Sequence, residues 1–126
     1  MKFSRLIVSL TLALTSAAAF ASDYLTIQLK DGPVVIKLSP DVAPQNVARI
    51  KALATSGKYN DVAFHRVIDG FMAQTGDVQF GNLRKGLDAT LVGTGGSSAP
   101  DLPAEFSNIP FDRGVVGMAR SSDPNS

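Results

Sequence analysis

The sequence lacks cysteine and tryptophan, and His65 is its single histidine. Without cysteine the chain can form no disulfide and has no thiol nucleophile, so its folded part must depend on an apolar core. One histidine and no cysteine leave too few ligands for a zinc site of the usual kind, and we expect no metal or other cofactor. A Ser-His-Asp arrangement would need His65 with Asp61 or Asp69, but no nucleophile elbow is present. The composition therefore gives no support to a hydrolase or a metalloenzyme.

The chain also lacks a strong excess of charge, with 12 basic and 11 acidic residues. Two of the basic residues, Lys2 and Arg5, lie in the N-terminal leader described next, which leaves the rest of the chain close to neutral. A nearly neutral surface does not attract phosphate backbones or anionic lipids. We expect neither nucleic acid nor a membrane surface as a partner.

The N-terminus has the three parts of a bacterial export signal. Lys2 and Arg5 form a positive region, 6–14 is apolar except for two hydroxyl residues, and 19–21 reads Ala-Phe-Ala. The apolar part is too short to span a bilayer, and no cysteine follows it for lipid attachment. The sequence predicts that 1–21 is a signal peptide, that 22–126 is a single domain without a membrane anchor, and that the mature chain is periplasmic. Secretion into the medium is the alternative.

The first half of this domain reads as two strands followed by a helix. Apolar residues alternate in 24–29, a Lys-Asp-Gly turn follows, and 34–38 is rich in β-branched residues. Pro44 is suited to the first turn of a helix, apolar residues recur at helical spacing from Val47, and Gly57 supplies a stop. Together with a hairpin in 64–77, the order is β-β-α-β-β, which favours an all-β or α+β architecture.

The second half is irregular. Glycine and proline interrupt 78–103, and loops of this length in compact domains are usually functional. The run Gly-Thr-Gly-Gly-Ser-Ser at 93–98 lacks the Gly-Lys-Ser/Thr ending of a phosphate loop, so we do not expect nucleotide binding. A short strand or turn is expected at 104–106. A strand is predicted at 113–119, where small residues indicate close approach of a ligand or another backbone.

The hairpin at 64–77 carries an arginine between two hydrophobes. Asp69-Gly70 is a turn signal, and alternation would put Phe64, Arg66 and Ile68 on one face. A three-residue loop would set Arg66 opposite Gln74, whereas a two-residue loop would set it opposite Ala73. A guanidinium keeps its charge, so Arg66 must either reach water at a sheet edge or face a cleft where a ligand completes its hydrogen bonds.

This hairpin resembles the signature of the cyclophilin family, Phe-His-Arg-Val-Ile-x-x-Phe-Met-x-Gln-x-Gly-Asp, at every fixed position. The resemblance runs from about Leu25 to the last residue and includes the helix start, the 93–96 loop and Gly117-Met118-Ala119. It implies a mainly β fold, a closed eight-stranded antiparallel barrel with a capping helix at each end. The chain stops before the family's Ser-Gln-Phe-Phe strand, so the resemblance implies a domain that is incomplete at the C-terminus. Thr75 and Arg120 stand where the family usually has Gly and Asn.

The resemblance also implies peptidyl-prolyl cis-trans isomerase activity during the folding of exported proteins. The partners would be proline-containing unfolded or partly folded polypeptides, and the protein would act as a monomer. Arg66 would be catalytic, donating a hydrogen bond to the prolyl nitrogen. The residues that would bind the substrate are His65, Phe71, Met72, Gln74, Gly93, Thr94, Ala119 and Arg120. The alternatives are a non-catalytic peptide-binding or chaperone module, or an inactive fragment of such an enzyme that does not fold stably alone.

Overall fold

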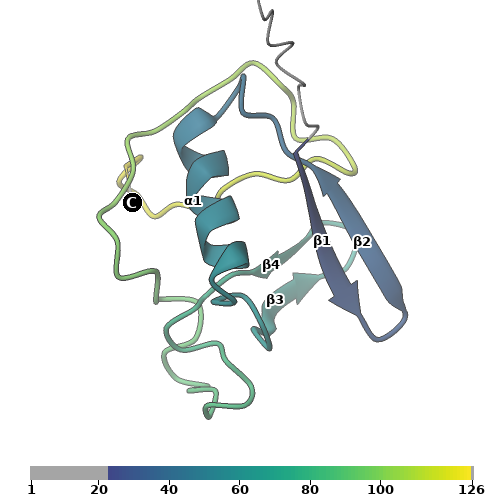
Figure 1. Ribbon diagram of the computed structural model, residues 1–126, viewed down its shortest axis with the longest axis vertical. Coiled ribbons are helices and arrows are strands. Elements are labelled where there is room, and N and C mark those ends of the chain that lie inside the picture. Colours follow the sequence, from purple (N-terminus) through teal and green to yellow (C-terminus); the bar gives the residue numbers. More distant parts are fainter. Residues whose placement is uncertain (1–22, 126) are drawn as a thin grey trace, which may run out of the picture.

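The computed structural model describes residues 23–125. The predicted signal peptide, 1–21, lies outside the described residues. The order of elements in the described part is β-β-α-β-β, as the sequence predicted (Figure 1). The elements are β1 (Tyr24–Leu29), β2 (Gly32–Lys37), α1 (Pro44–Thr55), β3 (Phe64–Ile68) and β4 (Met72–Thr75).

Strands β1 and β2 form an antiparallel hairpin in which Leu29 is paired with Gly32. Leu25 and Ile27 are half-buried while Thr26 and Gln28 are exposed, so the predicted alternation is confirmed for these residues, but Leu29 at the end of the strand is 40% exposed. Strand β2 begins two residues earlier than predicted, because Pro33 still pairs at the end of the hairpin, opposite Gln28. Gly32 has a φ of +130°, a conformation that glycine adopts without strain.

Helix α1 begins at Pro44, in the first turn as predicted. It ends before Gly57, whose φ of +71° lets the backbone turn back on the helix. The amide of Lys58 then donates to the carbonyl of Leu53 at 2.9 Å, which satisfies one of the last helical carbonyls. Among the described residues Val47 is the one buried apolar side chain, 8% exposed, so the helix contributes the centre of the small core.

Strands β3 and β4 form the second hairpin, and its register is that of a three-residue loop. Arg66 pairs with Gln74 and Ile68 with Met72, with Gly70 at a φ of +70° in the loop between them. Phe64 pairs with Thr75, which leaves His65 as an extra residue in a β-bulge. Gln74 and Thr75 are adjacent on β4 and point to opposite faces, so their partners Arg66 and Phe64 lie on opposite faces as well. The prediction that these two residues share a face is therefore wrong, because alternation holds only where the ladder is regular.

The two hairpins are separate two-stranded sheets in the described residues. In the view of Figure 1, α1 lies between the β1–β2 hairpin and the long green segment that follows β4. The described regular elements are mainly strands, in agreement with the predicted class. Closure into an eight-stranded barrel stays a prediction.

The prediction of a strand at 113–119 is wrong. These residues belong to no strand and are all exposed, with Val116 66% and Met118 52% exposed. A β-branched segment becomes a strand only when a neighbour accepts its hydrogen bonds, and no described strand pairs with this one. At Gly117 the close neighbour is the ring of Phe111, a side chain and not the ligand or backbone expected there, and a Cβ at Gly114 would meet nothing within 4 Å. Residues 104–106 are likewise neither strand nor turn.

Much apolar surface remains uncovered by the described residues. The side chains of Phe71, Phe106 and Phe111 are 75%, 75% and 81% exposed. Within residues 23–125 no helix combines the length and apolar character needed to cross a bilayer.

Candidate functional site

Arg66 and Gln74 lie opposite one another on β3 and β4. The three-residue loop 69–71 sets this register, and paired residues on antiparallel strands share a face. Arg66 is exposed and Gln74 is half-buried. Within residues 23–125 no side-chain hydrogen bond or ion pair engages the guanidinium of Arg66, so its donors are available to a ligand.

Apolar side chains accompany this pair on the hairpin. Ile68 and Met72 are paired two positions further along the ladder, on the same face as Arg66 and Gln74. Met72 is half-buried, whereas Phe71 in the loop is 75% exposed, and its amide donates to the carbonyl of Ile68 at 3.1 Å. The hairpin therefore presents a charged donor beside apolar groups, an arrangement suited to an apolar ring with a polar atom in it.

His65 connects the hairpin to the long loop. Its ring lies against Gly93, where an added Cβ would be 3.0 Å from Cδ2 and 3.2 Å from Nε2 of the imidazole. The Nδ1 atom of His65 is buried and has no hydrogen-bond partner among the described residues. The structure thus brings together two predicted substrate-binding residues that are far apart in sequence. Thr94 follows directly, with its hydroxyl donating to the carbonyl of Leu91 at 2.7 Å.

Asp77 holds the other side of this loop, and the sequence analysis assigned it no role. Its side chain is buried, 4% exposed. One carboxylate oxygen accepts the amides of Gln79 and Phe80, and the other accepts those of Gly93 at 2.7 Å and Gly95 at 3.1 Å. Burial by itself would raise the pKa of Asp77, but the four backbone donors outweigh it and lower that pKa. The sequence does contain a signal for this contact, a carboxylate followed by a glycine-rich loop. The two loop amides that bind Asp77 nevertheless lie 16 and 18 residues further along the chain.

Glu105 is the second residue that the sequence analysis passed over. The residue before α1, Ala43, provides no side-chain cap. Instead the carboxylate of Glu105 accepts the amides of Gln45 at 2.9 Å and Asn46 at 3.0 Å, and the Asn46 side-chain amide at 2.8 Å. Partial desolvation would raise the pKa of Glu105, but these donors lower it. The Glu105 carboxylate therefore caps the N-terminus of α1, although it is distant in the sequence.

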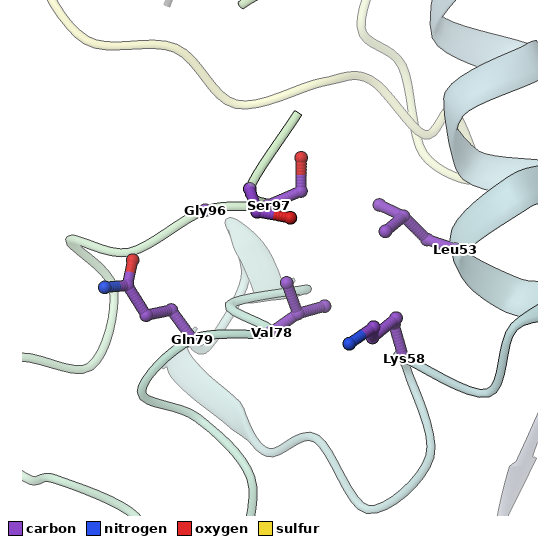
Figure 2. A pocket seen from close by; sticks show the side chains of 7 residues that line it. Leu53, Lys58, Val78, Gln79, Gly96 and Ser97 are labelled. Carbon is purple, nitrogen blue, oxygen red and sulfur yellow. The ribbon is translucent and has the colours of Figure 1, made fainter. Parts of the chain in front are cut away.

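A hollow of about 340 Å³ lies between the end of α1 and the loop at 96–98. Figure 2 shows Leu53 of α1 and Val78 near one another, with Ser97 across from Leu53. No predicted site residue lines this hollow, so the hairpin at Arg66 is the stronger candidate for the functional site. The hollow is lined by Leu53, Lys58, Val78, Gln79, Gly96, Ser97 and Ser98.

The last two predicted site residues, Ala119 and Arg120, lie in the exposed C-terminal segment. The guanidinium of Arg120 donates to the carbonyl of its neighbour Ser121 at 3.1 Å. No hydrogen bond between described residues joins either of them to the β3–β4 hairpin, and their roles stay predictions. In the described part of the chain no group of three potential metal ligands is found.

Comparison with known proteins identifies the class to which this fold and hairpin belong. The family model described as "Cyclophilin type peptidyl-prolyl cis-trans isomerase/CLD" matches residues 24–126. The chain therefore belongs to the cyclophilin family.

Individual relatives agree with this assignment. The chain is 63% identical over 112 residues to a "Probable peptidyl-prolyl cis-trans isomerase" of Brucella suis, covering 89% of this chain and 57% of the relative. It is 38% identical over 99 residues to "Peptidyl-prolyl cis-trans isomerase CYP57" of Arabidopsis thaliana, covering 75% of this chain and 18% of the relative. The chain thus spans little more than half the length of its Brucella relative.

A solved structure supports the fold. The crystal structure of cyclophilin AquaCyp293 from Hirschia baltica matches with a TM-score of 0.51 and 34% identity. The match covers 68% of this chain and 28% of that structure. The fold of the matched part of the chain is thus similar to part of a cyclophilin.

Proposed function

We propose that the protein is a peptidyl-prolyl cis-trans isomerase that acts on X-Pro bonds of unfolded or partly folded polypeptides. The observation that carries the proposal is Arg66, an exposed guanidinium with no partner among the described residues, paired with Gln74 in a complete family signature. Membership of the cyclophilin family supports it. So do the printed names of the relatives, although the chain spans only part of their length.

The proposed mechanism needs no covalent step. Rotation about an amide has a barrier of about 18–20 kcal/mol, because conjugation of the nitrogen lone pair is lost in the twisted state. Arg66 would donate a hydrogen bond to that lone pair, which becomes available only as the bond twists. Such a donor stabilises the transition state more than either planar state, and each ~1.4 kcal/mol of this difference gives about tenfold in rate. Met72 and Phe71 would contact the apolar part of the proline ring.

The wider context extends the same proposal. The leader at 1–21 supports export, so the clients would be exported proteins folding in the periplasm, with secretion into the medium as the alternative. In the whole protein we expect the two hairpins to belong to a closed eight-stranded barrel and the enzyme to be a monomer. A closed barrel would leave no unpaired strand edges.

The test is Arg66→Ala in the full-length protein, assayed by NMR exchange spectroscopy on a proline peptide. We expect kcat/KM to fall by about a hundredfold or more, with an unchanged circular dichroism spectrum. Arg84→Ala is the matched control, since Arg84 is also exposed but pairs with Asp61 at 3.1 Å. An Arg66→Ala variant as active as the parent would refute the assigned role.

The second candidate is a non-catalytic peptide-binding or chaperone module. The exposed side chains of Phe71, Phe106 and Phe111 favour it, because they offer apolar contact without chemistry. In that case the protein would bind a proline peptide, with its resonances shifted, while the cis/trans exchange rate stayed at the uncatalysed value.

A further inference from the structure

The carboxylate of Asp77 joins the end of the β3–β4 hairpin to the loop that carries Gly93 and Thr94. Asp77 lies two residues after β4, and one of its oxygens accepts both loop amides that flank Thr94, those of Gly93 and Gly95. Its other oxygen accepts the amides of Gln79 and Phe80. A carboxylate with all four acceptor positions occupied is fixed in orientation, so the loop is fixed with it.

The loop has no room to move toward this carboxylate. A Cβ on Gly95 would lie 2.5 Å from Oδ1 of Asp77 and 2.7 Å from a ring carbon of Phe80. On its other side Gly93 lies against His65, the residue that precedes Arg66. Thr94 is thus held between a glycine that contacts the bulge of β3 and a glycine that contacts Asp77.

We propose that Asp77 is a positioning residue, whose hydrogen bonds to Gly93 and Gly95 set the loop wall of the peptide-binding groove relative to Arg66. The inference rests on the isomerase function proposed above, and it adds a residue that touches neither substrate nor the rotating bond. A groove wall contacts the peptide in the planar and the twisted state alike. Loss of its position therefore weakens both equally, which raises KM and leaves kcat nearly unchanged.

The first variant is Asp77→Asn in the full-length protein. Asparagine has the same shape, but its NH2 group would face amide donors where a carboxylate oxygen accepted them. Asp88→Asn is the matched control, because the carboxylate of Asp88 also accepts several hydrogen bonds, all of them from Thr90 and Leu91 within its own turn.

We expect Asp77→Asn to raise KM about tenfold with kcat within about twofold of the parent. The amide resonances of Gly93 and Gly95 should shift, and their hydrogen exchange should become at least about tenfold faster. Asp88→Asn should change none of these quantities. If the resonances and the hydrogen exchange of the Gly93 and Gly95 amides did not change, Asp77 would not hold the loop. A fall in kcat at constant KM, or no kinetic change, would overturn the positioning role.

Gly95→Ala tests the same contact from the loop side if Asp77→Asn does not fold. Its Cβ would push the loop away from Asp77, and the same rise in KM is expected. If the parent protein catalyses no isomerisation, the proposed function fails. The positioning of the loop by Asp77 is then tested by the amide resonances of Gly93 and Gly95 and by the dissociation constant of a proline peptide. A weaker peptide complex in both variants supports the groove role, and equal affinity overturns it.

Discussion

The imidazole of His65 lies against the backbone of Gly93, with an added Cβ at Gly93 only 3.0 Å from its Cδ2 atom. This contact depends on the β-bulge, because His65 is the extra residue that β3 does not pair with β4. The bulge therefore directs the histidine to the loop while Arg66 keeps its register with Gln74.

Gly93→Ala should destabilise the protein by about 1–3 kcal/mol. The substitution combines a φ of +94°, which alanine adopts only with strain, with a clash against the His65 ring. Chemical denaturation followed by circular dichroism measures the change. Gly96→Ala is the control, since a Cβ there meets nothing within 4 Å, and it should leave the midpoint unchanged. Equal midpoints for Gly93→Ala and the parent would contradict the contact.

Thr75→Val should lower the free energy of unfolding by about 0.5–1.5 kcal/mol. The Thr75 hydroxyl donates to the carbonyl of Ala63 at 2.8 Å, which closes the open end of the β3–β4 hairpin. Valine keeps the shape and the β-propensity but not the donor. Thr26→Val on exposed β1 is the comparison and should be neutral or slightly stabilising. If both variants unfold at the same denaturant concentration as the parent, the Thr75 bond adds no stability.

Glu105→Gln should lower the melting temperature and reduce the helical signal at 222 nm. Gln45 and Asn46 donate to the two different carboxylate oxygens of Glu105, and glutamine has one carbonyl oxygen. The variant therefore loses one acceptor as well as the negative charge at the positive end of α1. Asp101→Asn removes a charge from the same segment without touching the helix, so it separates the local contact from net charge. A matching loss in both variants would assign the effect to charge alone.

Stability should fall as the pH drops below about 4. Asp77 and Glu105 have pKa values lowered in the fold, from ordinary values of 3.8 and 4.5. A lowered pKa means that the folded state binds fewer protons, so the stabilisation is complete above these ordinary values and is lost as pH falls through the folded ones. Urea midpoints measured from pH 6 to pH 2.5 should decline, and Asp77→Asn should decline less. An equally steep decline in that variant would show that other groups carry the acid sensitivity.

Local patterns in the sequence predicted the element order well. Alternation in 24–29, Pro44 and Gly57 each act through neighbouring residues, and the structure has the expected strand, helix start and helix stop. The register of the second hairpin was left open between two loops, and the structure has the three-residue one.

Long-range contacts were not predictable in the same way. Asp77 finds its loop partners 16 and 18 residues later, and Glu105 reaches α1 across about 60 residues, so no short window contains both partners. The strand predicted at 113–119 failed for a related reason, since a strand requires a neighbour that the segment itself does not specify.

The Glu105 contact also bears on the order in which the chain folds. The amides of Gln45 and Asn46 lie 60 and 59 residues before their acceptor in the sequence. Until Glu105 docks, the first turn of α1 can bond only to water or remain frayed, and closing so long a loop carries an entropic cost that a local cap avoids. The start of α1 is therefore a late-forming part of the native state.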